Sequence, residues 1–412
     1  MGAFIWFTVS RYKDCEVTCV PRIARNWRAR FREDQIEYVW LILLASLIGA
    51  LAALGNLGFR LLIDFSSSVF RGFEWRALEI ERGGAFATFT PVVLLSGGVV
   101  LLVLNYFFPG DVLGYGFPNF LAVVHLEGAR IKRRWIFLKA AAAAISLGAG
   151  ASVGREGPIA QIGGSIGSAA AQALRVGAQR GKVLVACGAG AGIATTFNAP
   201  IGGQLFAQEI VLLGETELGN LSLLIISTTA AVVTSGSLTG NEASVFRVSP
   251  FELRSYWELL TYSMMGITMG LLSAGYIRLF HATAEMFRRA NLSASVKLGS
   301  GLLAVGMIAI PLPQNLSDGY PVINAALAGQ LQVRRMVVLA VAKIVASCLS
   351  LCCGAPGGVF GPIFFIGTMG GGSFRALSEN FLPHFTGPRG SYALVGLGAF
   401  LAGCASRKPH PG

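Results

Sequence analysis

The stretch Lys139–Gly163 reads KAAAAAISLGAGASVGREGPIAQIG, and Lys343–Gly367 reads KIVASCLSLCCGAPGGVFGPIFFIG. The two stretches align without a gap at a constant shift of 204 positions, and twelve of their 25 residues are identical. Each contains an apolar run with one lysine, then a glycine-rich break, then a second apolar run. In a membrane protein, such paired breaks in the two halves of the chain indicate a substrate or ion site between two repeats.

The composition predicts a membrane protein. Of the 412 residues, 53% are hydrophobic and only 13% are charged, whereas soluble domains average about 25% charged residues. Runs such as Val39–Leu62 and Pro91–Phe108 suit a bilayer, which takes about 20 residues to cross. Other runs are shorter or interrupted by glycine, and such breaks persist only inside a helical bundle. We therefore expect an all-α membrane protein, with the lipid bilayer as a partner, built from two repeats of tilted and broken helices.

The net charge of +12 is an orientation signal rather than a nucleic-acid site. Basic residues beside a membrane span mark the cytoplasmic side, so we expect a cytoplasmic N-terminus. The sequence shows no nucleic-acid motif, secretory signal, spaced metal ligands or nucleophile–base pair at bilayer depth. We therefore expect no nucleic-acid partner, no cofactor, no metal and no enzymatic activity. The basic residues concerned precede the first apolar run: Arg22, Arg25, Arg28, Arg30 and Arg32.

Polar breaks divide the chain into four parts. We assign residues 1–35 to a cytoplasmic arm, 36–235 to membrane repeat 1, 250–405 to membrane repeat 2, and 406–412 to an aberrant tail. No separate soluble domain is expected at either end.

The second repeat is expected to be incomplete. Gly396–Ala402 (GLGAFLA) is the counterpart of Gly188–Ala194 (GAGAGIA), but no counterpart of Phe197–Ser235 follows it. A frame change or a premature stop would produce the ending Arg407–Gly412, and natural shortening is the alternative. We therefore expect the last helices of the repeat to be missing.

The sharpest motif is GREGP at Gly154–Pro158. Its glycines let backbone amides approach an ion, and its proline suits the first turn of a helix. A helix that begins here points its positive end and its N–H groups at an anion. A carboxylate at Glu156 can fill the anion position when ionised and leave it when protonated, so we predict that Glu156 is a gate. The alternative is a structural pair between Glu156 and Arg155.

The matching break in the second repeat, GGVFGP at Gly357–Pro362, carries no charge. It offers the backbone amides of Val359 and Phe360 to an anion without a competing carboxylate. Lys139 and Lys343 occupy matching positions of the two repeats and would raise the positive potential along an anion path. The alternative for both lysines is that they extend to the membrane surface.

A third glycine-bracketed motif is GYGFP at Gly114–Pro118, and GYP at Gly319–Pro321 is its approximate counterpart. The first is a glycine-bracketed turn before an apolar segment. An ordinary turn is the alternative.

Together these motifs, with FNAP at Phe197–Pro200, resemble the CLC family of chloride channels and proton/chloride exchangers over about Trp27–Ala402. The resemblance implies two inverted repeats, a homodimer with one anion path per subunit, and a multi-pass protein of the bacterial inner membrane without CBS domains. It also implies that Glu156 is the external gating glutamate. The anion-binding positions that it implies are Tyr115, Gly116, Phe117, Gly154, Arg155, Gly157, Val359 and Phe360.

The sequence departs from the family pattern in three places. Tyr115 stands where the first motif commonly has a serine that faces the anion, so the size selectivity is open. The family exchangers carry a proton-transfer glutamate ten residues after the FNAP proline, and that position is Ile210 here, with Glu209 one place earlier. The tyrosine that the last helices of the family contribute falls in the missing segment.

The resulting prediction is a glutamate-gated pathway for chloride or a similar monovalent anion. We expect channel-like conduction, because isoleucine at position 210 cannot relay a proton. A proton/chloride antiporter is the alternative, and a preference for fluoride or nitrate would rest on Tyr115. A truncated, nonfunctional remnant of such a transporter is the other class, suggested by the incomplete second repeat.

Overall fold

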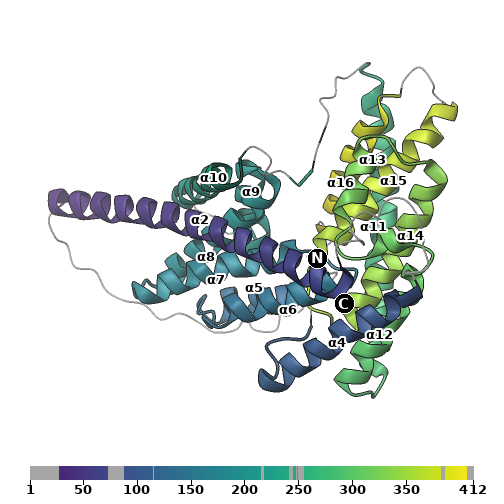
Figure 1. Cartoon of the computed structure of the whole chain (residues 1–412). Helices are drawn as coiled ribbons and strands as arrows, with labels where there is room; N and C mark the ends of the chain where they lie inside the picture. Colours follow the sequence, from purple (N-terminus) through teal and green to yellow (C-terminus); the bar gives the residue numbers. More distant parts are fainter. Residues whose placement is uncertain are drawn as a thin grey trace.

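The first half of the chain forms a bundle around one long helix. In the computed structural model, α2 contacts α6, α7, α8 and α10, and α4 extends toward the second half (Figure 1). The described residues are 27–72, 88–114, 116–214, 218–240, 245–246, 248, 255–381 and 386–405. The elements of this half are α2 (Trp27–Arg71), α4 (Thr90–Phe107), α5 (Gly116–Leu126), α6 (Trp135–Ala149), α7 (Glu156–Ala173), α8 (Ala178–Phe197), α9 (Pro200–Phe206), a π-helical turn (Ala207–Val211) and α10 (Leu218–Thr239).

The second half packs beside it, and the two halves form distinct helical bodies in Figure 1. Within it, α15 contacts α14 and α16, while α12 crosses over to pack against α4 of the first half. Its elements are α11 (Glu258–Arg289), α12 (Ala294–Ala309), a 3-10 turn (Pro313–Asn315), α13 (Tyr320–Leu327), α14 (Val333–Cys352), α15 (Phe360–Phe381) and α16 (Arg389–Ala405). The expected all-α fold with broken helices is confirmed.

Within the part of the chain that the structure describes, four helices are long and apolar enough to cross a membrane by length and composition alone. Others, including α5 and α6, are apolar but too short for a full span. The four candidate spans are Tyr38–Phe70, Thr90–Phe107, Asn220–Thr239 and Val333–Cys352.

The expected boundary between the arm and membrane repeat 1, at residue 35, lies within helix α2 and stays a prediction. Helix α2 runs without interruption from Trp27 into the span that begins at Tyr38. The physical reason is that the sequence has no glycine or proline between Trp27 and Gly49 that would end a helix. Residues 1–26 and the tail 406–412 lie outside the described residues.

The two repeated stretches fold alike. Helices α6 and α14 end within one residue of matching positions, at Ala149 and Cys352, and the matched Gly150 and Gly354 adopt nearly the same left-handed φ, 104° and 103°. After each glycine the chain makes a short break, and α7 and α15 then begin at Glu156 and Phe360, again 204 residues apart. Glycine favours this conformation because a β-carbon would be strained there. The repeat read from the sequence is therefore a repeat of backbone conformation.

The two larger hydrophobic clusters among the described residues draw on both halves. One joins Phe117 and Leu121 of α5 to Tyr320 of α13 and Phe365 of α15. The other joins Leu147 of α6 to many residues of the second half. Because each cluster is shared, the burial of apolar side chains holds the two repeats against each other.

Candidate functional site

The glycine-rich breaks of the two repeats meet at the centre of the molecule. The N–H of Gly154 donates to the carbonyl oxygen of Gly358 at 2.7 Å, and the N–H of Gly358 donates back to Gly154 at 2.8 Å. A β-carbon on Gly157 would lie 3.1 Å from the Cα of Gly358, and one on Gly361 would lie 2.8 Å from the Cα of Gly154. The two breaks approach this closely only because these positions lack side chains.

A second pair of hydrogen bonds connects the loop before each short helix to the opposite repeat. The N–H of Gly114, before α5, donates to the carbonyl of Gly354 at 2.8 Å. The N–H of Ser317, before α13, donates to the carbonyl of Gly150 at 3.2 Å. These reciprocal bonds bring the first turns of α5, α7, α13 and α15 together.

Glu156 lies where these helix starts converge. It is the first residue of α7 and only 1% of its surface is exposed. One carboxylate oxygen accepts from the backbone N–H of Gly361 at 2.9 Å, and the other accepts from the hydroxyl of Tyr320. A carboxylate of the first repeat therefore occupies donors that the second repeat supplies at the N-termini of α13 and α15, positions that favour negative charge.

The side chain of Arg155 turns away from its neighbour Glu156. Its Nε donates to Asp318 at 2.6 Å, a second guanidinium nitrogen forms an ion pair with the same carboxylate, and the guanidinium lies 4.7 Å from the centroid of the Tyr320 ring. Asp318 also accepts from the backbone N–H of Tyr320 at 3.3 Å. The alternative of a Glu156–Arg155 pair is therefore replaced by a pair between Arg155 and Asp318.

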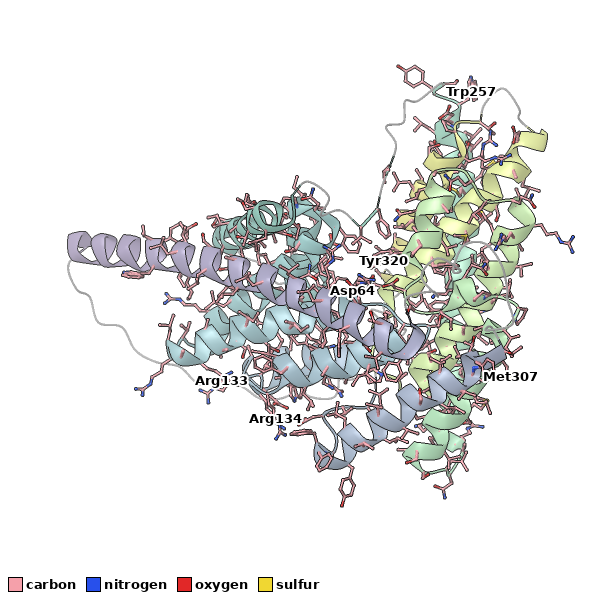
Figure 2. The ribbon with its side chains drawn as sticks, in the orientation of Figure 1. Asp64, Arg133, Arg134, Trp257, Met307 and Tyr320 are labelled. Atoms are coloured by element: carbon pink, nitrogen blue, oxygen red, sulfur yellow. The ribbon has the colours of Figure 1, made fainter. Side chains whose placement is uncertain are left out.

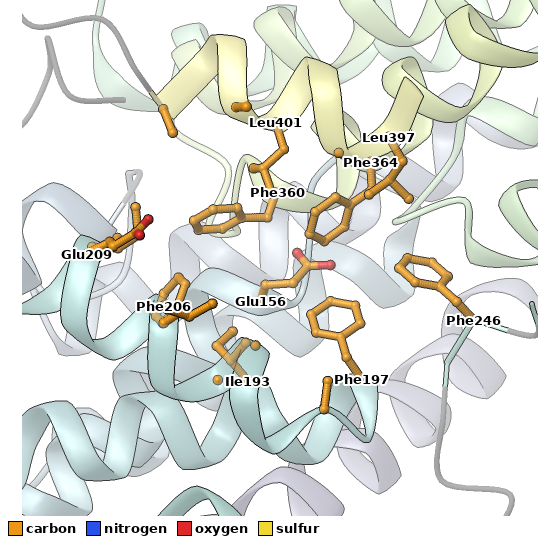
Figure 3. A pocket seen from close by; sticks show the side chains of 18 residues that line it. Glu156, Ile193, Phe197, Phe206, Glu209, Phe246, Phe360, Phe364, Leu397 and Leu401 are labelled. Atoms are coloured by element: carbon orange, nitrogen blue, oxygen red, sulfur yellow. The ribbon is translucent and has the colours of Figure 1, made fainter. Parts of the chain in front are cut away.

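A cavity of about 510 Å³ opens beside Glu156. Figure 3 shows the Glu156 carboxylate at its centre, among phenylalanine rings, with Glu209 at one end. Phe206 and Phe360 form an edge-to-face pair with ring centroids 5.6 Å apart. The side chains that line this cavity are mostly apolar, and they include Ile193, Phe197, Phe206, Phe246, Phe360, Phe364, Leu397 and Leu401.

Several of the predicted site residues come together here. Phe117, in the first turn of α5, packs edge to face on Phe360 with ring centroids 6.1 Å apart. Val359, the residue before Phe360, is also buried. Gly116 is buried at the start of α5. Tyr115 lies outside the described residues.

The expectation that the Gly154 amide binds an anion does not fit this arrangement. Its N–H is committed to the carbonyl of Gly358, so Gly154 shapes the site rather than offering a donor. Sequence reasoning also missed two residues, Gly361 and Tyr320, whose donors hold Glu156. The shift of 204 could have identified Gly361 as the partner of Gly157, and the GYP motif could have placed Tyr320 at a helix start.

The two matched lysines have different environments. The ammonium of Lys139 lies beside the start of α5, 3.4 Å from where a β-carbon of Gly116 would be. Lys343 is completely buried and donates to the carbonyls of Asn315 and Ser317 at 3.0 and 2.7 Å. These bonds attach α14 to the loop that leads into α13, so the contacts of Lys343 are those of a structural residue.

We expect Lys343→Met to lower the stability of the protein by about 2 kcal/mol, because the buried carbonyls of Asn315 and Ser317 lose their charged donor. Thermal unfolding in detergent measures this loss. The matched control is Lys132→Met at an exposed loop position, which should leave the melting temperature unchanged. An unchanged melting temperature in Lys343→Met, together with weaker chloride binding, would instead favour a role in the anion path.

Comparison with known proteins finds a matching family model and relatives along most of the chain. A family model described as voltage gated chloride channel matches residues 92–407. A chloride channel protein of Ralstonia nicotianae, described as ClcB-like, is 31% identical over 88% of this chain and 85% of its own length. An H⁺/Cl⁻ exchange transporter ClcA of Cronobacter sakazakii is 30% identical over 88% of this chain and 78% of its own length.

Two solved structures show the same fold. A slow cyanobacterial Cl⁻/H⁺ antiporter superposes with a TM-score of 0.76 at 22% identity, over 88% of this chain and 85% of the other. A CLC-type fluoride/proton antiporter superposes with a TM-score of 0.73 at 22% identity, over 90% of this chain and 88% of the other.

Proposed function

This chain belongs to the voltage-gated chloride channel family, and on that basis we propose that it moves a monovalent anion across a membrane in exchange for protons. The observation that carries the proposal is the buried carboxylate of Glu156 resting on hydrogen-bond donors of the opposite repeat. We take chloride as the transported anion because the relatives named above are described as chloride proteins. Fluoride is the alternative to be tested beside it.

Glu156 acts as the gate in this proposal. When its carboxyl group is ionised, it occupies the N–H of Gly361 and the hydroxyl of Tyr320, and an anion is excluded. When the group takes up a proton, its attraction for these donors weakens and the side chain can leave. Proton binding by Glu156 is then linked to the entry of an anion.

The backbone around Glu156 supplies the anion site. Helices α7 and α15 both begin at this point, and the first turn of each adds N–H groups without an intrahelical partner. The amides at Arg155, Gly157, Val359 and Phe360 are the candidates from sequence, and Gly361 joins them as the donor now occupied by Glu156. Neutral dipoles of this kind attract an anion and still allow it to leave.

Exchange is favoured over the channel-like conduction expected from Ile210. ClcA, described as an exchange transporter, is a relative at 30% identity, and Glu209 offers a carboxylate for the proton. The helix after FNAP widens into a π-helical turn at Ala207–Val211, in which the N–H of Leu212 reaches back five residues to Ala207 at 3.0 Å. The number of residues after the FNAP proline therefore does not by itself decide which residue faces the cavity. Glu209 lines the cavity together with Ile210.

The test is transport by the purified chain in liposomes loaded with chloride. An outward chloride gradient should drive proton uptake when the pH is equal inside and outside the liposomes. The proton uptake should keep a fixed ratio to chloride efflux. Efflux without proton movement would favour the channel, and efflux at the level of empty liposomes would contradict transport altogether. Repeating the measurement with fluoride decides the selectivity.

We expect Glu209→Gln to reduce proton uptake by about a hundredfold while chloride efflux persists, because the amide cannot carry the proton between the solution and Glu156. Proton and chloride fluxes are measured in the same liposomes. The matched control is Glu127→Gln, which removes a carboxylate from an exposed loop. Full proton uptake in Glu209→Gln would show that the proton passes between the solution and Glu156 through another group.

We further propose that the protein is a homodimer in the bacterial inner membrane with its N-terminus in the cytoplasm. The support is the origin of the relatives, which come from bacteria, and the large apolar side chains exposed along α10 and α11, including Ile225, Val233, Ile267 and Leu271. Chemical crosslinking in native membranes tests the dimer.

A further inference from the structure

We infer that the hydroxyl of Tyr320 is a side-chain ligand of the transported anion, a role that rests on the proposed function. It holds the carboxylate of Glu156 when the site is closed and the anion when Glu156 has left. Figure 2 shows Tyr320 where the two halves of the molecule meet. The position belongs to α13, a helix to which the sequence motifs assigned no anion contact.

The backbone places this hydroxyl firmly. Gly319 adopts a left-handed φ of 74°, and Pro321 follows in the first turn of α13, so the chain turns sharply just before Tyr320. A β-carbon on Gly319 would lie 2.6 Å from a ring atom of Phe365, so position 319 has no room for a side chain. The phenol of Tyr320 therefore extends from a rigid helix start.

The ring of Tyr320 is held on two sides. The guanidinium of Arg155 lies over it at 4.7 Å, and Phe246 packs against it edge to face at 5.3 Å. Phe246 and Glu156 both line the cavity, so the Tyr320 side chain contacts two residues of the cavity wall. Only 4% of the residue is exposed, so little of the rotational freedom of the side chain is left to lose when it binds a ligand.

The charges near the phenol leave it suited to an anion. The carboxylate of Asp318, which would repel one, is neutralised by its ion pair with Arg155. When Glu156 leaves, a buried O–H and the N–H of Gly361 face the same vacated position, and a buried donor without an acceptor is unfavourable. A small anion restores both hydrogen bonds without a covalent step or a bound cation.

Calorimetric titration of chloride into the detergent-solubilised protein tests this role. In a Glu156→Ala background the site is vacant, and adding Tyr320→Phe should weaken chloride binding about tenfold, the loss expected for one hydrogen bond to a charged group. The substitution keeps the ring that packs on Arg155 and Phe246. The matched control is Tyr392→Phe, which removes a buried hydroxyl paired with Thr261 and should leave the affinity unchanged.

Equal chloride affinity with and without the Tyr320 hydroxyl would overturn the inference, as would an absence of chloride binding in Glu156→Ala. If the double variant does not fold, the single Tyr320→Phe variant decides, since chloride should then raise its melting temperature less than that of the wild type. An equal rise would overturn the inference. Binding needs no transport, so a chain that binds chloride through Tyr320 but moves no protons contradicts the exchange proposal alone.

Discussion

Replacing Glu156 with alanine is expected to reduce proton transport by at least about a hundredfold while anion flux continues. In the wild type, the ionised carboxylate competes with the anion for the Gly361 amide and the Tyr320 hydroxyl. Anion flux should therefore fall as pH rises and more of the carboxyl groups ionise. Alanine cannot compete for these donors, so the flux of the variant should lose this pH dependence.

Flux measurements across pH in liposomes check the prediction. Arg155, Asp318 and Tyr320 are the charged and titratable groups beside Glu156, and Glu209 lines the same cavity. Arg155 and Asp318 form an ion pair that should remain in the variant. Glu127→Gln, in an exposed loop, is the control and should retain the wild-type profile. Proton transport that survives Glu156→Ala would place the gate at another residue.

Replacing Gly188 with alanine is expected to destabilise the protein by about 3 kcal/mol, and valine should prevent folding. Gly188 of α8 crosses Gly163 of α7, and a β-carbon on either would overlap the carbonyl oxygen of the other. Because the obstacle is backbone rather than a movable side chain, the two helices would have to separate. Small residues at such crossings are what allow membrane helices to pack closely.

Thermal unfolding and the yield of monodisperse protein measure this effect. Gly275 in α11 is the matched control, since nothing lies within 4 Å of the β-carbon that alanine would add there. Gly275→Ala should be neutral or stabilise the helix by up to about 1 kcal/mol. A normal melting temperature for Gly188→Ala would mean that α7 and α8 do not cross at this point.

The site was predictable from sequence to the extent that it depends on local structure. The positions where α7 and α15 begin follow from the repeated glycine and proline pattern, and Glu156 is conspicuous as a carboxylate in an apolar region. The orientation of Glu209 was not predictable in this way. It depends on a π-helical turn at Ala207–Val211, and residue spacing assumes a regular helix.

Lysine roles were not predictable either. Lys139 and Lys343 match perfectly in the alignment of the repeats, yet Lys343 is bound to the carbonyls of Asn315 and Ser317. A buried ammonium binds whatever acceptors lie around it, and those acceptors come from a loop that the repeat pattern does not describe. Identical positions in a repeat therefore share backbone conformation more reliably than side-chain partners.

The sequence by itself determined the two repeats, the helix starts and the carboxylate of the GREGP motif, because glycine, proline and apolar spacing act over a few residues. Only the tertiary structure decided which groups that carboxylate contacts. Tyr320 and Gly361 are 164 and 205 residues away from Glu156 along the chain. Partners so distant are chosen by how the two repeats pack, through the Gly154–Gly358 contact and the shared core, and no local pattern encodes that placement.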